Sequence, residues 1–137
     1  MQDCIFCKIV KQEIPCAEVY ADERTLAFLD IGPIARGHTL IIPKAHYLNL
    51  WEVPGELAKD LLATMQKVGR ALMQTTKATG MNVVMNNYES AGQVVPHAHW
   101  HLIPRIEGDG LFPVVQQEYE SREAMNELAE RMQQAMG

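Results

Sequence analysis

Three of the five histidines stand at alternate positions, His97, His99 and His101, in a segment bounded by two prolines. Side chains along a strand point alternately to opposite faces, so a strand over Pro96–Pro104 puts the three imidazoles on one face and the intervening residues on a core face. Three imidazolium ions side by side repel one another, which indicates that at least one ring stays neutral near pH 7. A neutral imidazole is a nucleophile, and the middle ring, His99, is best placed to attack phosphorus. Its neighbours could stabilise the phosphoryl oxygens or protonate the leaving group.

Other interpretations of the same histidines stay open. The row could be a solvated strand face, or it could hold a catalytic zinc ion, because histidines two apart in a strand can ligate one metal. It could also belong to a non-catalytic nucleotide-binding scaffold. If one nitrogen of His99 donates to a backbone carbonyl, the tautomer is fixed and the other nitrogen presents a lone pair for attack.

The loop before the histidines, residues 91–94, is suited to hold a phosphate group. Its backbone N–H groups can donate to phosphate oxygens, and Gly92 permits a close approach. The side-chain amide of Asn86 could donate to the same oxygens. These features point to phosphate only because the histidines follow them.

Cys4 and Cys7 have the two-residue spacing that lets both thiolates bind one tetrahedral ion, which makes them half of a zinc site. The pair could instead be a redox dithiol, although no thioredoxin-like strand order accompanies it. Cys16 has no partner in this pattern and is predicted to be a small core residue. Three cysteines with this spacing favour a reducing compartment over a disulfide framework.

The elements that position these residues predict an α+β fold with an antiparallel sheet of about five strands and two main helices. The longest helix opens at Pro54, carries an apolar stripe at helical spacing and is predicted to stop at Gly80. The last helix is predicted from about Ser121, with Met125, Leu128, Ala129 and Met132 on one side. The strands are predicted at residues 16–22, 25–31, 39–43, 82–86 and 96–104, and a short helix or turn at residues 4–12, with Ile5, Ile9 and Val10 facing inward.

The composition bounds the classes of function. At 137 residues with an ordinary globular balance of apolar and charged residues, the chain is predicted to be a single domain, 1–137. A formal net charge of −5 disfavours nonspecific binding to nucleic acid or to an anionic membrane. No segment approaches the roughly 18 apolar residues of a membrane span, and residues 1–4 show no basic segment followed by a long apolar one. The expected compartment is the cytoplasm.

The segment His97-Ala98-His99-Trp100-His101-Leu102-Ile103 resembles the signature of the histidine triad (HIT) superfamily, His-x-His-x-His followed by apolar residues. Residues 37–46, GHTLIIPKAH, resemble the family's other recurring segment, and residues 27–31 resemble the strand before it. With residues 4–9 and 13–15, the resemblance covers roughly the first 105 residues.

This resemblance implies an α+β homodimer in which strands of two subunits form one continuous sheet. It also implies nucleotidyl hydrolase or transferase activity at the α-phosphate of adenylated or dinucleotide substrates. Carried across by position, His99 would be the nucleophile that forms a nucleotidyl-histidine intermediate, and His101 would act at the leaving group or phosphate. His38 would support the row from a neighbouring strand, and His97 completes the triad.

The resemblance also implies a site for a purine nucleotide or an adenylated small molecule. Asp30 matches the carboxylate that hydrogen-bonds the ribose hydroxyls, and the apolar faces of a base suit an apolar slot. The residues matched to the base slot are Phe6, Ile9, Ile14, Phe28, Ile31 and Leu40, and those matched to the α-phosphate are Asn86, Gly92, Gln93 and Val94.

Some bacterial members of the family bind zinc through a cysteine pair, the histidine after Pro-Lys-x, and the first triad histidine. The matching residues here are Cys4, Cys7, His46 and His97. A closed Cys₂His₂ set leaves no open coordination position, so the resemblance implies a structural zinc ion that ties the N-terminus to the active strand. A His97 that holds zinc cannot be the nucleophile, which favours His99.

Two departures from the family pattern bear on substrate choice. Val94 stands where the Hint branch carries a serine, so a hydroxyl contact to phosphate is replaced by a backbone N–H alone. From Pro113 to Gly137 the chain follows neither the Hint nor the Fhit ending, a region that helps to select the substrate. The leaving group therefore stays open.

Overall fold

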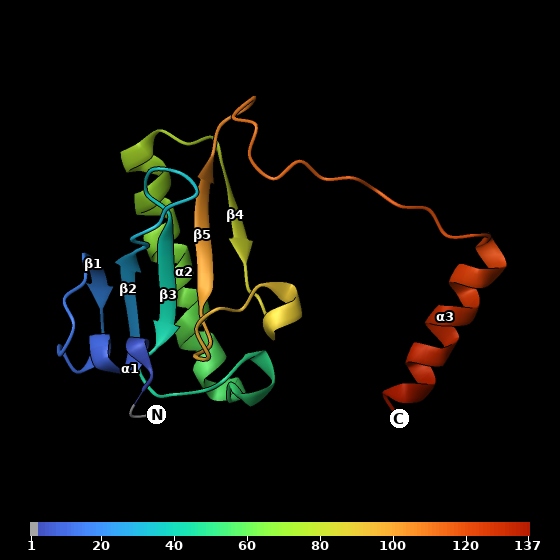
Figure 1. Ribbon diagram of the computed structural model, residues 1–137, viewed down its shortest axis with the longest axis horizontal. Coiled ribbons are helices and arrows are strands. Elements are labelled where there is room, and N and C mark those ends of the chain that lie inside the picture. Colours follow the sequence, from blue (N-terminus) through green and yellow to red (C-terminus); the bar gives the residue numbers. More distant parts are fainter. Residues whose placement is uncertain (1–2) are drawn as a thin grey trace.

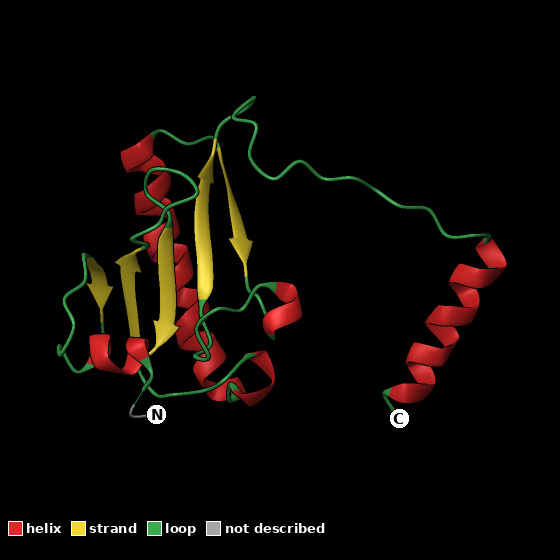
Figure 2. Ribbon diagram, in the orientation of Figure 1, coloured by secondary structure: helices red, strands yellow, loops and turns green. Residues whose placement is uncertain are grey.

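The fold is a five-stranded antiparallel sheet with one long helix packed along one face, described for residues 3–137 by a computed structural model (Figure 1, Figure 2). The strands are β1 (Glu18–Ala21), β2 (Thr25–Leu29), β3 (Thr39–Pro43), β4 (Gly80–Val84) and β5 (Trp100–Arg105), and their order across the sheet is β1-β2-β3-β5-β4. The helices are α1 (Ile5–Val10), α2 (Gly55–Thr76) and α3 (Arg122–Ala135), with short 3₁₀ turns η1 (Leu50–Glu52) and η2 (Glu89–Ala91). The predicted α+β class, its five antiparallel strands and its two main helices are confirmed.

Residues 1 and 2, which formed part of the segment used to predict the compartment, lie outside the described residues. Within residues 3–137, each helix is too short or too polar to cross a lipid bilayer.

The first hairpin is fixed by a polar turn. The carboxylate of Asp22 accepts hydrogen bonds from the backbone N–H groups of Arg24 and Thr25, at 2.9 and 2.7 Å. This side-chain-to-backbone bonding turns the chain between β1 and β2. The strand predicted to reach residue 31 ends at Leu29, because Asp30 begins a second turn in which its Oδ1 accepts from the N–H of Gly32 at 2.8 Å.

Helix α2 ends earlier than predicted. Lys77 adopts the left-handed conformation with a φ of 60°, and its N–H donates to the carbonyl of Met73. This is an αL cap in the position that glycine usually takes. The predicted stop at Gly80 is therefore wrong, and Gly80 instead opens β4, which ends at Val84 rather than at Asn86.

The sheet separates two apolar clusters. One lies between the sheet and α2 and includes Ala27, Ile41, Leu61, Val68 and Leu102. The other lies on the opposite face, where α1 closes over it, and includes Phe6, Phe28, Leu40 and Ile42. In α1 it is Phe6 that packs inward, whereas Ile5, predicted to face inward, is 45% exposed. The face closed by α1 carries the candidate site.

The C-terminal segment departs from the rest of the fold. After β5 the chain runs away from the sheet as an extended segment and ends in α3, which stands apart from the other elements (Figure 1). Ser121 caps this helix, since its Oγ accepts from the N–H of Ala124 at 3.0 Å, so the predicted start near Ser121 is confirmed. None of the side chains of α3 is buried.

Candidate functional site

The histidine segment enters the sheet later than predicted. Strand β5 begins at Trp100, so His97 and His99 precede it, and the predicted start of this strand at Pro96 is wrong. The partner strand β3 ends at Pro43, which has no N–H to donate to a longer ladder. The backbone N–H of Ala98 instead donates to the carbonyl of Tyr47 at 2.7 Å. This leaves the segment before β5 free to turn.

His97 lies on the same side of the sheet as His99, since the ring of Phe6 lies edge-on to both, but His97 does not line the main cavity. His97 is fully buried, and its Nε2 lies 2.8 Å from the carbonyl oxygen of Pro43. His99 and His101 line the main cavity, with ring centroids 5.0 Å apart. The predicted core face is confirmed, because Ala98 and Leu102 have no exposed area.

The geometry around His99 fixes its tautomer. Its Nδ1 lies 2.7 Å from the carbonyl oxygen of His97. A carbonyl only accepts hydrogen bonds, so Nδ1 carries the proton and Nε2 of the neutral ring presents a lone pair. The ring is 6% exposed and is held edge-on by Phe6, with 5.1 Å between centroids. The residue therefore has the tautomer that a nucleophile at the cavity wall requires.

A chain of hydrogen bonds orients His101. The backbone N–H of Ile34 donates to Nδ1 of His38 at 3.0 Å, so Nε2 of the neutral His38 ring carries the proton. That nitrogen lies 2.9 Å from Nδ1 of His101, which must accept. Nε2 of His101 is then protonated and is a hydrogen-bond donor. The two cavity histidines thus present one lone pair and one N–H.

Burial keeps these imidazoles neutral. It lowers the pKa of His101 to about 4, and the nearby rings of His99 and His38 act in the same direction. Burial also lowers the pKa of His38 and of His99, while the carboxylate of Asp30 opposes the shift in both. Oδ2 of Asp30 lies 3.5 Å from Nε2 of His38. These lowered pKa values agree with the sequence-based expectation that at least one ring stays neutral near pH 7.

The main cavity has a volume of about 790 Å³ and lies between α1, β2 and the histidines. Its wall is mostly apolar and contains all six residues predicted for the base slot. The residues that were predicted for the site and that line this cavity are Phe6, Ile9, Ile14, Phe28, Ile31, Leu40, Asp30, Gly92, Val94, His99 and His101. Cys16 also lines it and is exposed, so the prediction that Cys16 is a core residue is wrong. A nucleoside-sized ligand fits such a volume.

The loop before the histidines is more internally bonded than the sequence suggested. The N–H of Gly92 donates to the carbonyl of Glu89, and the N–H of Gln93 donates to that of Tyr88. The side chain of Gln93 is buried and donates to the carbonyl oxygens of Leu48 and Val95. Gln93 therefore shapes the loop and does not line the cavity.

Two features of this loop still suit a phosphate group. Gly92 has a φ of +95°, and a Cβ there would lie 3.5 Å from the side-chain nitrogen of Asn86. The amide of Asn86 therefore faces the glycine turn. Val94 is 88% exposed at the cavity, so its backbone can be reached by a ligand.

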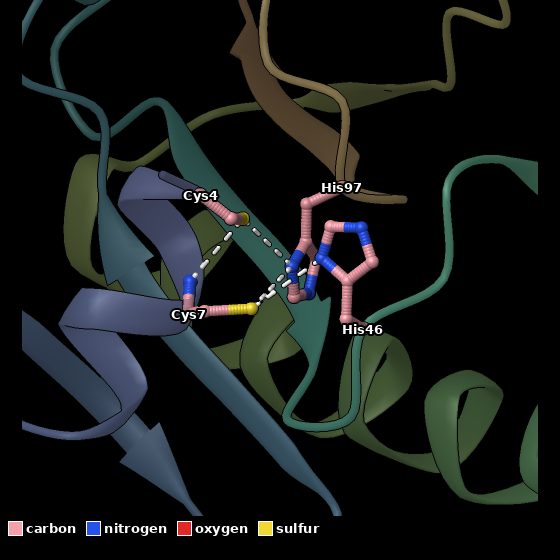
Figure 3. A group of neighbouring side chains, drawn as sticks. All are labelled: Cys4, Cys7, His46 and His97. Atoms are coloured by element: carbon pink, nitrogen blue, oxygen red, sulfur yellow. Dashed lines mark hydrogen bonds between the residues drawn. The ribbon is translucent and has the colours of Figure 1, made fainter. Parts of the chain in front are cut away.

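Four side chains from three segments meet behind the cavity (Figure 3). Cys4 and Cys7 come from the start of α1, His46 from the loop after β3, and His97 from the histidine segment. Sγ of Cys4 lies 3.4 Å from Nδ1 of His97, and Sγ of Cys7 lies 3.4 Å from Nδ1 of His46 and 3.7 Å from Nδ1 of His97. All four predicted metal ligands are thus brought together.

This donor set fits a zinc ion. With Zn–S near 2.3 Å and Zn–N near 2.0 Å, the edges of a regular tetrahedron are roughly 3.3–3.8 Å, which matches the donor separations. Because Nε2 of His97 donates to Pro43, its Nδ1 is unprotonated and faces the sulfur atoms. Burial and the adjacent Cys4 raise the pKa of the Cys7 thiol, so a cation is needed to hold thiolates here. A bound zinc ion would link α1 to the histidine segment.

Two backbone groups determine histidine tautomers in the site and were not predicted from the sequence. The carbonyl of Pro43 sets the tautomer of His97, and the N–H of Ile34 sets that of His38. Every residue has a backbone carbonyl and every residue except proline has a backbone N–H, so no side-chain pattern marks these two groups.

Paired cavity histidines with fixed tautomers, held at the entry of a central antiparallel strand, define a protein of the histidine triad class. The chain belongs to the HIT family, because the model of the HIT domain matches residues 11–108. Residues 113–137 lie outside that match.

Curated relatives support the same family. The chain is 49% identical over 110 residues to Protein hit of Bacillus subtilis, covering 80% of this chain and 76% of the relative. It is 44% identical over 106 residues to adenosine 5′-monophosphoramidase HNT1 of Candida albicans, covering 74% of this chain and 70% of the relative.

Solved structures match over nearly the whole chain. SMU.412c from Streptococcus mutans superposes with a TM-score of 0.93 at 45% identity, covering 100% of this chain and 87% of that one. A Zn-bound histidine triad protein from Mycobacterium smegmatis superposes with a TM-score of 0.77 at 36% identity, covering 95% of this chain and 98% of that one.

Proposed function

We propose that the protein is a nucleotide hydrolase or transferase that acts at the α-phosphate of adenylated or dinucleotide substrates. The observation that carries this proposal is the tautomer of His99, whose Nδ1 donates to the His97 carbonyl and leaves Nε2 with a lone pair at the cavity wall. A relative at 44% identity is named an adenosine 5′-monophosphoramidase, which supports the reaction class. Cytoplasmic location and a single HIT domain over residues 1–137 are parts of the same proposal.

In the first step, Nε2 of His99 bonds to phosphorus while the bond from phosphorus to the leaving group breaks. The leaving atom keeps the electron pair of that bond. An anhydride leaving group departs as an anion, whereas an amine also takes a proton, for which we propose Nε2–H of His101, on the ring next to His99, as the donor. The nucleotidyl-imidazolium keeps its Nδ1–H on the carbonyl of His97, which stabilises the new positive charge.

In the second step, a water oxygen attacks phosphorus, the phosphorus–nitrogen bond breaks, and Nε2 of His99 regains its lone pair. For an amine leaving group, one water proton restores Nε2–H of His101; for an anhydride leaving group, whose departure takes no proton from His101, that water proton goes to solvent. The products are a nucleoside monophosphate and the free leaving group. The amide of Asn86 and the backbone of Val94 are proposed to hold the phosphoryl oxygens. A zinc ion on Cys4, Cys7, His46 and His97 would act structurally in this scheme, by holding His97 in place.

The alternative of a zinc-catalysed hydrolase with all three triad histidines as ligands lacks a geometric basis. Among the described residues, the groups of converging metal donors separate His97 from His101, and neither group includes His99. The alternative of a non-catalytic scaffold predicts mononucleotide binding without product. A panel of adenosine phosphoramidates, dinucleoside polyphosphates and lysyl-adenylates decides this, because turnover of any member with release of AMP contradicts the scaffold. Absence of AMP from every member contradicts the proposed hydrolase.

We also propose a homodimer that continues the sheet through β4. The two edge strands are β1 and β4, and β1 has an irregular register between Glu18 and Tyr20, a feature that disfavours edge pairing. Strand β4 is regular and carries Val83, which is 50% exposed. It is the edge suited to pair with a second copy.

Asp30→Asn should raise KM for a ribonucleotide substrate by about 10- to 100-fold, the loss expected for one charged hydrogen bond. The carboxylate lines the cavity, and the proposal places it on the ribose hydroxyls. Steady-state kinetics with a 2′,3′-dideoxy analogue is the matched control, because that substrate has no hydroxyls to lose. Equal penalties on both substrates would contradict ribose binding by Asp30.

A further inference from the structure

Helix α3 carries an apolar stripe that is not buried by any other element within residues 3–137. Met125, Leu128, Ala129 and Met132 lie on one side of this 14-residue helix, and Leu128 and Met132 are 44% and 58% exposed. An isolated helix of this length is marginal in water and needs tertiary packing to be stable. The stripe therefore requires a surface to pack on.

The direction in which the chain leaves the sheet is fixed by a bonded turn. The guanidinium of Arg105, at the end of β5, forms two hydrogen bonds to the carboxylate of Asp109, at 2.8 and 2.6 Å. It also donates to the carbonyl of Leu111 at 3.0 Å and lies 5.5 Å from the ring centre of Phe112. We call residues 111–137 the arm. The bonds of this turn set the direction in which the arm leaves the sheet.

The arm passes beyond β4, the open edge of the sheet (Figure 1). Its extended part exposes Val114, Val115 and Tyr119 by 80%, 88% and 59%. The Streptococcus mutans structure superposes over 100% of this chain, the arm included, with a TM-score of 0.93. An arm that keeps its path in a solved relative needs a partner to hold it.

The exposed area of the chain supports the same conclusion. A compact monomer of this mass exposes about 7,200 Å². The chain exposes 9746 Å², an excess of roughly 2,500 Å² over that value. A standard protein interface needs only about 800 Å² from each partner. The excess is large enough for an intertwined dimer.

A groove of about 310 Å³ lies at the opposite side of the body, between β1, β2 and the C-terminal half of α2. Val19 and Leu29 line it and are 44% and 42% exposed, and Leu72 and Thr76 line its α2 side. The surface of the groove is mostly apolar. Val19 and Leu29 thus leave apolar side chains of this groove open to a partner.

The arm is long enough to join the two surfaces across a dimer. Its ten extended residues, 111–120, span up to about 33 Å. Five strands about 4.8 Å apart span roughly 24 Å, which is the width of a second copy's sheet. With β4 paired to its counterpart, an arm that crosses the open edge traverses the second sheet and brings α3 to its β1 side.

We propose that α3 of each copy packs its apolar stripe into the β1–β2–α2 groove of the other copy, so that the two arms are exchanged. A two-fold axis makes the two contacts identical. This inference rests on the homodimer proposed above and on no part of its phosphate chemistry.

Disulfide trapping between differently tagged subunits tests the exchange. Full-length chains carry Cys16→Ser, with Val19→Cys in one tagged form and Leu128→Cys in the other. Mixed dimers, prepared with zinc and oxidised mildly, should give a disulfide between the two tags. Glu127→Cys, on the opposite side of α3, is the matched control and should give at least fivefold less. Equal yields, or no disulfide between tags, would overturn the exchange.

A second measurement separates the arm from the β4 contact. Leu128→Gln should weaken dimerisation by about 10- to 100-fold in sedimentation equilibrium, whereas Glu127→Gln should leave it unchanged. A wild-type dimer that is insensitive to Leu128→Gln would refute the exchange and leave the homodimer standing. A wild-type monomer at micromolar concentration would refute both.

Discussion

His99→Ala should lower kcat for AMP release by about four orders of magnitude or more, because it removes the only side chain proposed to bond to phosphorus. In wild-type enzyme mixed with substrate and quenched with denaturant at alkaline pH, where the phosphorus–nitrogen bond is stable, intact-protein mass spectrometry should detect a nucleotidyl adduct. The adduct should be absent from the variant.

The controls for this experiment separate chemistry from folding. His99 is almost fully buried, so its loss leaves a cavity, and the variant must first show wild-type zinc content and a cooperative thermal transition. His99→Gln keeps more of the side-chain volume and should be equally inactive. Hydrolysis at the wild-type rate in either folded variant would remove His99 from its proposed role.

Removal of zinc should lower the melting temperature by about 10–20 °C, since three separate chain segments then lose their common ligand. Metal analysis of the isolated protein should give one zinc ion per chain. Dialysis against a strong chelator should produce the shift, and added zinc should reverse it. A protein that holds no zinc and keeps its melting temperature with chelator would contradict the structural site.

Cys7→Ser should reproduce the effect of chelation, and Cys16→Ser provides its matched control. Both substitutions replace a thiol by a hydroxyl, but only Cys7 lies against His46 and His97, at 3.4 and 3.7 Å. Cys16 is exposed and is not part of the metal-ligand group. Loss of zinc should also lower kcat in Cys7→Ser, because the carbonyl that fixes the tautomer of His99 belongs to His97.

The sequence could predict what periodicity and side-chain chemistry encode. The apolar stripe of α2, the β1–β2 turn at Asp22 and the β3 strand up to Pro43 all follow from local patterns. The four metal-ligand residues also meet as predicted, because the family resemblance supplied the two distant histidines. The predicted start of the histidine strand at Pro96 failed, since β5 begins only at Trp100 and β3 ends at Pro43, which has no N–H to offer.

Other errors have a common physical origin in tertiary context. Lys77 caps α2 in a left-handed conformation for which glycine is the usual signal, and the sequence offered Gly80 instead. Cys16 is small and apolar enough for a core but lies where the chain turns outward at the cavity. The path of the arm could not be predicted either, because it depends on the turn that Arg105 and Asp109 build in space.

The position of Cys16 makes it a suitable site for attaching a fluorescent label. Burial and the neighbouring Glu18 raise the pKa of its thiol, so it reacts slowly at neutral pH, and alkylation near pH 9 would be selective over thiols shielded by zinc. A fluorophore attached there would stand at the wall of the main cavity. Its emission would report occupancy in real time, without a labelled substrate.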